Sequence, residues 1–371
     1  MSAEQNSRSS EPGTIEPLPD QAETDPAAAA GSEKHGLSKV RLVLAALVLI
    51  TLVIGGLGLY WSMQPAPFSV KDNLTEMLGN DAVSDEDTPV SQVPGAAVVA
   101  TQIRVARTLL EKPGGYLRND MTPPGVLMDN MPNWESGVIT ELRDSVRSLR
   151  NDFSRSQSQS IESPLLKRAD SDFNFSAESW FLPSSEEMYK DGIKNLQGYL
   201  DALVSGERNA GFFVRADNLR AYLEVVEKRL GSYGQRLAAS VGDPELTAAL
   251  DSRRAAAEGE MPVIQQQTID PTPWHEIDDV FYEARGYAWA LLHMMNAIQI
   301  DFATVLRQKN AEVSMKQIIA DLEHAVVRKY SPIVLNGHGF GMLANHSLVL
   351  ASYLGRANAA IIDLRVLLER G

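Results

Sequence analysis

Four polar residues stand out because they lie in a segment that is otherwise apolar. A segment that is apolar nearly all round is expected to form the central helix of its domain. Glu283 and His293 are predicted to face a common space, lined by the small residues Gly286 and Ala290. There a carboxylate and an imidazole can bind a ligand or transfer a proton. The alternative is structural, an ion pair of Glu283 with Arg215 or another core arginine. The four polar residues are Glu283, Arg285, His293 and Asn296.

A second candidate site is a loop in which glycine alternates with other residues, just before the last expected helix. Its backbone N–H groups can bind an anion at the N-terminus of that helix. The loop lacks the lysine of a P-loop and follows no predicted strand, so it is not a nucleotide-binding motif. A helix connection that requires positive φ angles explains the glycines equally well. The candidate ligand-binding residues of this loop are Asn336, Gly337, His338, Gly339 and Gly341.

The sequence contains no complete catalytic or metal-binding motif. It has no cysteine, which excludes thiolate zinc sites, cysteine nucleophiles and disulfides. A di-iron bundle needs two Glu-x-x-His pairs, and the chain offers one imperfect match, Asp321-Leu322-Glu323-His324. We therefore predict no metal, no cofactor and no catalytic residue, and a binding protein rather than an enzyme.

The central helix has recognisable start signals. Thr272 is predicted to be its N-cap, with Pro273 at the first helical position. Glu276, Asp278 and Asp279 fall in the first turns, where the helix dipole stabilises carboxylates. These three acids are therefore explained without a functional role.

The same spacing of apolar residues by threes and fours recurs through the folded region and predicts an all-α protein. Short connections favour an antiparallel helical bundle. It is predicted to have two packed halves, 95–258 and 274–371, joined by a linker over 259–273. Helices are expected over 99–110, 138–153, 189–203, 219–237, 277–305, 315–326 and 350–368.

A capping box is predicted to begin the third of these helices. Ser184 is followed three residues later by Glu187, the spacing in which each side chain bonds the backbone N–H of the other residue. Four aromatic residues come shortly before it, and we expect them to pack into the core rather than form a surface groove. They are Phe173, Phe175, Trp180 and Phe181.

Ahead of the bundle, an uncharged stretch from Leu42 to Trp61 is predicted to cross a membrane. As a helix its 20 residues span ~30 Å, the hydrocarbon thickness of a bilayer. Tyr60 and Trp61 end it with amphipathic rings that favour the membrane interface. A signal peptide has a shorter apolar core and a cleavage site after it, which is missing here. We expect this stretch to remain as an anchor.

Basic residues give the predicted orientation. Lys34, Lys39 and Arg41 precede the apolar stretch, whereas Lys71 is the one basic residue soon after it. The positive-inside rule therefore places the N-terminus in the cytoplasm and the bundle in the periplasm, on a bacterial inner membrane. The predicted order is a disordered cytoplasmic tail over 1–38, the transmembrane helix over 39–62 and a tether over 63–94.

The charge of the chain argues against nucleic acid as a partner. Its formal net charge is −14, and no run of Lys or Arg occurs, whereas phosphate backbones are bound by clustered positive charge. The expected partners are the bilayer, through Leu42 to Trp61, and another protein of the cell envelope.

Four stretches of the folded region are long enough to be specific. They are WFLPSSEEMYKDGI, FFVRADNL, PWHEIDDVFYEARGYAWALLHMM and VLNGHGFGMLANHSLVLASYLGRANAAIIDLR. With them the chain resembles the bacterial family of domain of unknown function 2333, over most of the region after the apolar stretch. The resemblance implies a Gram-negative envelope protein with an N-terminal anchor, and it supplies no catalytic residues.

Two functional hypotheses follow from these observations. The first is a membrane-anchored binding or scaffolding module whose helical domain binds another envelope component. The second is a periplasmic enzyme, or a carrier of lipid or cell-wall fragments, that uses Glu283, His293 and the glycine-rich loop.

Overall fold

The second of two compact units contains nearly all of the fold. The units are Met1–Val53 and Ile54–Gly371. Within the described part of the chain all regular structure is helical, as predicted. The predicted linker, 259–273, lies outside the described residues except at Thr272 and Pro273. The computed structural model describes residues 26–79, 93–155, 162–208, 210–240, 272–329, 334–336 and 345–370, with side chains from residue 39 onward.

The apolar stretch forms the long helix α1, Pro26–Trp61. Its 23 residues Lys39–Trp61 are long and apolar enough to cross a membrane, and none of that window is buried. By length and composition, this helix fits a membrane anchor or a signal sequence. It begins before the predicted boundary at 39, and the alanine run 27–30 accounts for the extension because alanine has the highest helix propensity.

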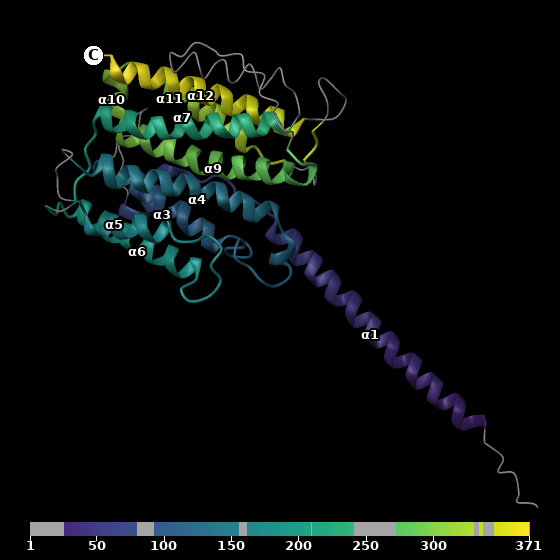
Figure 1. The fold of residues 1–371 in the computed structure, drawn as a ribbon. Helices are drawn as coiled ribbons and strands as arrows, with labels where there is room; N and C mark the ends of the chain where they lie inside the picture. Colours follow the sequence, from purple (N-terminus) through teal and green to yellow (C-terminus); the bar gives the residue numbers. More distant parts are fainter. Residues whose placement is uncertain are drawn as a thin grey trace, which may run out of the picture. The chain divides into compact units, whose positions relative to one another are not determined.

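Helix α9, Ile277–Asp301, lies between two groups of helices in the second unit (Figure 1). Most of its residues are buried, which confirms that it is the central helix. On one side it contacts α3 and α4, and on the other α7, α11 and α12. These helices are α3, Ala96–Glu111; α4, Asn130–Ser148; α7, Ala216–Ala239; α11, Glu312–Val326; and α12, His346–Glu369.

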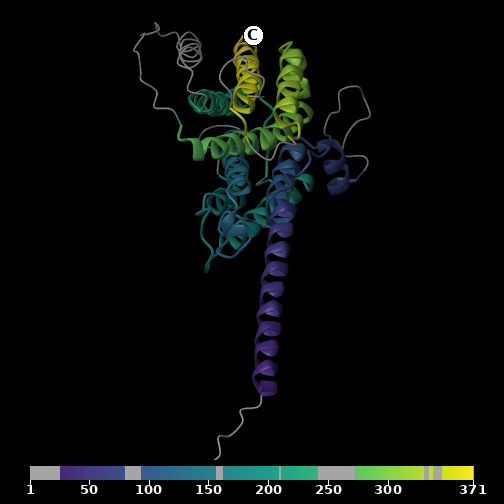
Figure 2. The same cartoon turned by 90° about the vertical axis from the view of Figure 1, so that its right-hand side faces the viewer.

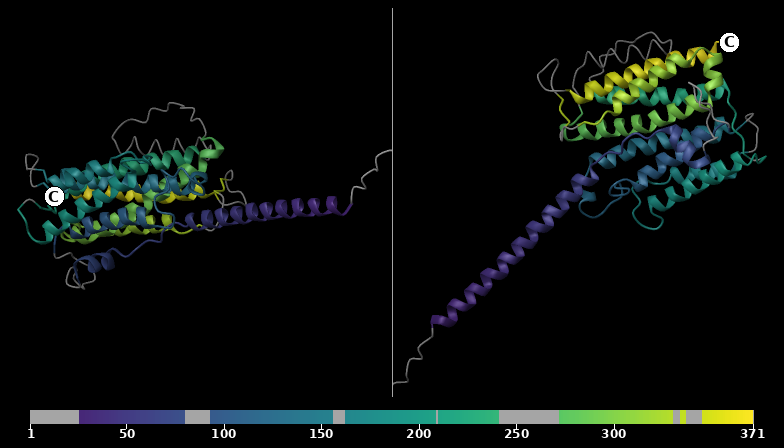
Figure 3. Two further views of the ribbon diagram at one scale, coloured as in Figure 1. Left: turned by 90° about the horizontal axis from the view of Figure 1, so that it is seen from below. Right: turned by 180° about the vertical axis from the view of Figure 1, so that it is seen from behind.

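The remaining long helices complete a layered bundle. Helices α5, Pro164–Phe173, and α6, Ser185–Val204, contact α4 and α3 respectively. Figure 2 and Figure 3 show α11 and α12 on the opposite side of α9 from these four helices. Although α7 belongs by sequence to the first predicted half, it packs along α12. The two predicted halves therefore share one hydrophobic core.

Helices α5 and α6 run antiparallel, and so do α11 and α12, the arrangement predicted for neighbouring helices of the bundle. In contrast, α4 and α9 run in the same direction. Near their starts Asn133 Nδ2 donates a hydrogen bond of 2.5 Å to Asp279, and past the end of both helices Phe153 lies against Phe302 with ring centroids 5.4 Å apart. The intervening helices return the chain to the end at which α4 began.

Two glycines allow α4 and α9 to approach closely. A Cβ added at Gly286 would lie 1.9 Å from the carbonyl oxygen of Trp134, and one at Gly137 would lie 2.0 Å from that of Glu283. No larger side chain fits at either position without moving a backbone. The space predicted beside Gly286 is therefore filled by α4, and the prediction of a ligand space there is wrong.

Several short helices have no counterpart in the sequence prediction. Helix α2, Val70–Leu78, lies in the segment predicted as a tether, 63–94, and its Val70 and Leu74 are buried. At nine residues it is too short to show a clear period. The others are α5; η2, Gly125–Leu127; and η4, Trp274–Glu276. The π-helical η3, Leu149–Phe153, lies at the end of the helix predicted over 138–153, and α10, Ala303–Gln308, overlaps the end of the one predicted over 277–305.

The start of α9 differs from the prediction. The turn η4 precedes it, α9 begins at Ile277, and Thr272 is not its N-cap. Pro273 has φ −52° and ψ 140°, an extended conformation that no first helical residue adopts. The N-cap of α6 is confirmed, since Ser184 Oγ accepts a 3.2 Å hydrogen bond from the Glu187 N–H.

The aromatic residues before α6 do not all join the core. Phe173 is fully buried, as predicted, and Phe175 is partly buried. Trp180 and Phe181 are 59% and 64% exposed, so the prediction that they pack inside is wrong. Their loop is held at its base by hydrogen bonds from serine hydroxyls to backbone carbonyl oxygens, and its tip is in contact with solvent.

Candidate functional site

A cavity of about 580 Å³ lies between α9 and the segment that follows α1. Residues 64–71 form one wall, the α9 face from Arg285 to Ile300 forms another, and the end of α11 with residues 327 and 328 forms the third. Ligand pockets in proteins have volumes of about 300–1,000 Å³. The cavity is therefore large enough to hold a small molecule.

Aromatic side chains and cations dominate the cavity walls. The Trp134 and Trp289 rings lie 5.2 Å apart, and Phe68 meets Trp289 edge-on at 6.0 Å. Such walls favour an apolar or aromatic ligand body. Charged lining residues are mostly basic, so the cavity also favours negative charge. They are Lys71, Arg285 and Arg328, with one carboxylate, Glu323.

His293 is held in the cavity wall by both of its ring nitrogens. Its Nε2 accepts a 3.0 Å hydrogen bond from the Phe68 N–H, and its Nδ1 lies 2.6 Å from the Trp289 carbonyl oxygen. These partners require a proton on Nδ1 and none on Nε2, the neutral tautomer. The Phe68 ring also stacks on the imidazole at 3.9 Å. These contacts let His293 position the Phe68 segment, and burial lowers the pKa of His293 to about 4, which keeps the imidazole neutral at pH 7.

Arg285 is a buried cation whose hydrogen-bond partners are all neutral. Its guanidinium donates to the carbonyl oxygens of residues 325–327 at the end of α11, at 2.9–3.2 Å, and to Gln64 Oε1 at 3.1 Å. Arg285 is 4% exposed, and no carboxylate pairs with it within the described part of the chain. Burial lowers its pKa to about 10, which leaves it charged at neutral pH. The carbonyls of a helix end offset only part of such a charge.

Trp289 adds an unsatisfied donor to the same wall. The residue is 3% exposed, and its indole Nε1 has no hydrogen-bond partner among the described residues. Buried indole N–H groups usually have a partner. Next to it, Asn296 Nδ2 donates to the Leu292 carbonyl oxygen at 2.8 Å, which leaves the amide oxygen of Asn296 for another donor.

Glu283 lies away from the cavity and forms the structural ion pair of the alternative prediction. Its carboxylate accepts a hydrogen bond of 2.7 Å from Arg236 on α7 and one of 3.3 Å from the Tyr233 hydroxyl. Arg215 instead pairs with Asp217. Glu283 and His293 are ten residues apart, and each residue turns an α-helix by about 100°. Their side chains therefore leave α9 in directions roughly 80° apart, so the prediction that they face one space is wrong.

The glycine-rich loop is described only at its first residue. Asn336 Oδ1 accepts a 3.3 Å hydrogen bond from the Ser347 N–H in the first turn of α12, and its Nδ2 has no partner among the described residues. Asn336 thus helps to cap α12, whose N-cap is Asn345. Gly337, His338, Gly339 and Gly341 lie outside the described residues.

The core contains ionisable groups that the sequence reasoning missed. Lys112 Nζ and Glu135 form a fully buried ion pair of 2.5 Å, in which Glu135 also accepts the N–H groups of residues 117 and 118. Glu141 on α4 is 1% exposed and accepts a 2.7 Å hydrogen bond from the Tyr222 hydroxyl. Burial raises the pKa of Glu141 to about 8. Among the described residues no group of three His, Cys, Asp or Glu is placed to hold a metal.

The sequence therefore identified three cavity residues, Arg285, His293 and Asn296, and missed the segment that faces them. A signal was present, because Trp289 lies four residues from both Arg285 and His293 and places an aromatic ring on the same helix face. Phe68 gave no such signal, since it lies 225 residues from His293 in the sequence.

Comparison with known proteins gives a family but no relative of known activity. Neither the curated proteins nor the solved structures contain a match to this chain. A family model described as an uncharacterized protein conserved in bacteria matches residues 32–371. This match spans most of α1 and the whole helical bundle. The chain therefore belongs to the bacterial family of domain of unknown function 2333.

Proposed function

We propose that this protein is a single-pass inner-membrane protein whose periplasmic helical domain binds a small anionic amphiphile. Helix α1 supplies a span of bilayer length, and the basic residues before it favour a cytoplasmic N-terminus. A fusion of alkaline phosphatase after Gly371 tests this orientation. An active fusion is expected, and a fusion that is expressed but inactive would reverse the orientation.

One observation carries the ligand proposal: Arg285 is a buried cation in the wall of a cavity, with neutral partners only within the described residues. An unpaired buried charge is costly, and an anionic group on a ligand removes much of that cost. Aromatic rings and aliphatic side chains, among them Phe68, Trp134 and Trp289, supply the apolar part of the cavity lining. A molecule with an apolar body and one carboxylate or phosphate satisfies both features.

The same geometry favours binding over catalysis. Both nitrogens of His293 are engaged, and its low pKa keeps the imidazole neutral. Glu283 is paired with Arg236 on another face of α9. A general base needs a free lone pair near the reacting atom; His293 has none, and the carboxylate of Glu283 lies away from the cavity. The cavity wall formed by residues 64–71 begins three residues after α1 ends, so the ligand site lies close to the anchor.

The proposal is tested by ligand binding to the full-length protein in lipid nanodiscs. The probe is 11-(dansylamino)undecanoic acid, an anionic amphiphile, and empty nanodiscs measure its partition into lipid. Replacing Arg285 with Met keeps the side-chain length and removes the charge. A charge-assisted hydrogen bond contributes about 1.5–3 kcal/mol, so Arg285→Met is expected to weaken binding at least tenfold.

Two further variants make the test specific. Ala66→Trp fills the cavity without touching Arg285 and is also expected to abolish binding. Arg220→Met removes an exposed arginine outside the cavity and should leave binding unchanged. Equal probe affinity in all variants would contradict the ligand proposal. Recovery of one envelope protein at equal stoichiometry, with an empty cavity, would favour the scaffolding function instead.

A further inference from the structure

Six large apolar side chains are exposed on two neighbouring loops of the bundle. One loop joins α3 to α4 and the other joins α5 to α6. Their exposed fractions range from 50% to 77%. Large exposed apolar patches on soluble domains mark surfaces that bind a partner or a membrane. We call these residues the apolar tip: Met121, Val126, Leu127, Trp180, Phe181 and Leu182.

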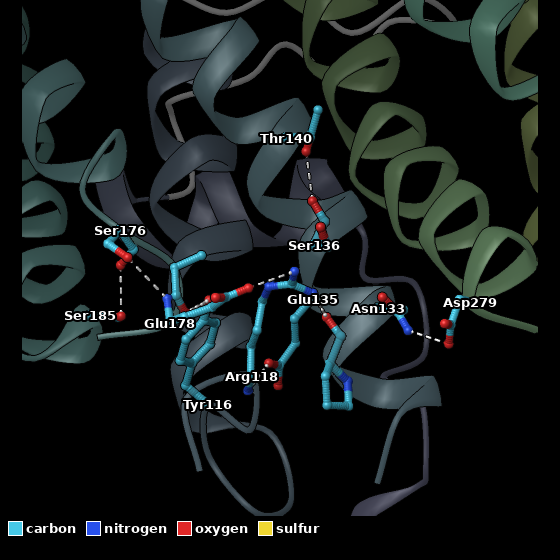
Figure 4. Close-up of polar contacts among 12 residues, drawn as sticks. Tyr116, Arg118, Asn133, Glu135, Ser136, Thr140, Ser176, Glu178, Ser185 and Asp279 are labelled. Atoms are coloured by element: carbon cyan, nitrogen blue, oxygen red, sulfur yellow. Dashed lines mark hydrogen bonds and ion pairs between the residues drawn. The ribbon is translucent and has the colours of Figure 1, made fainter. Parts of the chain in front are cut away.

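Hydrogen bonds join the two loops into one surface. The Tyr116 hydroxyl donates to the Ala177 carbonyl oxygen at 2.9 Å, and Asn119 Nδ2 donates to the Ser179 carbonyl oxygen at 2.8 Å. Arg118 and Glu178 add an ion pair of 3.2 Å, drawn in Figure 4. The two halves of the apolar tip are therefore held together by bonds between their loops.

The loop that carries Trp180 is also held from within. Ser185 Oγ donates to the Ser176 carbonyl oxygen at 2.8 Å, as Figure 4 shows. It also lies 3.0 Å from the Ser179 carbonyl oxygen. Ser179 Oγ donates to the Pro183 carbonyl oxygen at 2.9 Å. These bonds satisfy backbone groups at the base of the loop, so the exposed rings belong to an ordered turn. The rings of Trp180 and Phe181 lie 5.4 Å apart.

The first of the two loops lies against the last turns of α1. A Cβ at Gly114 would come within 2.7 Å of the Trp61 ring, and Gly58 faces Pro124 with 3.7 Å between the corresponding Cβ positions. Trp61 is the residue at which the apolar helix ends. The apolar tip therefore adjoins the point at which α1 enters the bundle, the level of the membrane interface if α1 is an anchor.

We propose that the apolar tip inserts into the interfacial region of the bilayer that α1 crosses. The proposal rests on the anchor part of the proposed function. Tryptophan, phenylalanine and leucine are the side chains that interfacial contacts use. The charged groups around the tip include the carboxylates Asp120, Asp129 and Glu178, which do not attract anionic lipid. Burial of apolar surface is therefore the driving force, and the contact should be insensitive to salt and to lipid charge.

The absence of cysteine makes a direct test possible. Single cysteines are placed by Phe181→Cys and Leu127→Cys, labelled with the environment-sensitive fluorophore NBD, and the full-length protein is reconstituted into phosphatidylcholine vesicles. Lipids brominated on the acyl chain then quench any label that reaches the bilayer. Leu59→Cys in α1 is the control for the anchor. Val313→Cys, 79% exposed at the start of α11 and remote from the tip, is the control for solvent.

We expect blue-shifted emission and quenching at positions 59, 127 and 181, and neither at 313. Quenching at 59 with solvent-like labels at 127 and 181 would overturn the tip proposal and leave the anchor standing. A blue-shifted but unquenched label at 181 would show a protein contact, such as a second copy of the chain, and would also overturn it. Labels unquenched at all four positions would refute the anchor, and the tip proposal with it. Loss of the quenching at 181 in 1 M salt would refute an apolar driving force.

Discussion

We expect acidification to destabilise the helical bundle through His293. The imidazole is 1% exposed and holds the segment around Phe68 by accepting its N–H at 3.0 Å. Burial lowers its pKa from the ordinary 6.5 to about 4. A group with a lowered folded-state pKa stabilises the protein fully above the unfolded-state pKa, and this contribution is lost as the pH falls. The loss should therefore occur between about pH 6.5 and pH 4.

The size of the effect follows from the same pKa change. One pKa unit corresponds to about 1.4 kcal/mol. His293 should therefore lower the free energy of unfolding by about 3 kcal/mol between pH 7 and pH 4. The measurement is urea unfolding of the full-length protein in nonionic detergent, followed by near-ultraviolet circular dichroism at a series of pH values. His293→Gln is the control, because glutamine can accept the Phe68 N–H and does not titrate.

Comparison of the two proteins isolates the histidine. Carboxylates that titrate in the same range contribute equally to both, so the difference between their pH profiles belongs to His293. Between pH 7 and pH 4, we expect the free energy of unfolding to fall by about 3 kcal/mol less in His293→Gln than in the wild type. Parallel profiles would refute the reasoning, because they would show that the imidazole is accessible to protons in the folded state.

Four further substitutions test the packing and the buried ionisable groups of the core. Gly286→Ala should destabilise the protein, because the new Cβ would meet the Trp134 carbonyl oxygen. At Gly234 a new Cβ meets no atom within 4 Å, so Gly234→Ala should stabilise α7 by up to ~1 kcal/mol. Thermal melting of the two variants compares these effects. Lys112→Met leaves a buried carboxylate unpaired and should cost about 3–5 kcal/mol in urea unfolding. Burial raises the pKa of Glu141 from 4.5 to about 8, so its contribution to the free energy of unfolding is lost as the pH rises from 4.5 to 8. Glu141→Gln should therefore make the free energy of unfolding less dependent on pH over that range.

The fold was largely predictable because its main signal is local. Apolar residues spaced by threes and fours mark every long helix of the bundle, and α9 is central because it is apolar nearly all round. Helices α2 and α5 escaped prediction because segments of nine and ten residues hold too few apolar positions to show a period. The parallel arrangement of α4 and α9 depends on contacts between distant segments, which no local pattern contains.

The candidate site was predictable only in part. Arg285 and His293 could be identified as polar residues on an apolar helix, but the phase of the helix directs Glu283 elsewhere. Residues 64–69 resist prediction because Pro65 and Pro67 give an extended segment with no periodicity. Its place against α9 is fixed by tertiary contacts, the stacking of Phe68 on His293 among them.

The segment 64–71 connects three properties of this protein. It continues the chain from α1, it forms a wall of the cavity, and it is fixed by the neutral form of His293. Protonation of His293 removes the acceptor for the Phe68 N–H, so acid should loosen the cavity wall before the bundle as a whole unfolds. A ligand that needs this wall should bind less tightly once His293 is protonated, and by linkage it then opposes that protonation. A bound amphiphile stabilises the folded state of both the wild type and His293→Gln against acid, so a shifted acid transition alone does not distinguish them. The affinity for the amphiphile should instead fall more steeply toward pH 4 in the wild type than in His293→Gln, and this difference separates a ligand in the cavity from lipid bound elsewhere. A steeper rise in the wild type would show that attraction between the anionic group and the imidazolium outweighs the loosening of the wall.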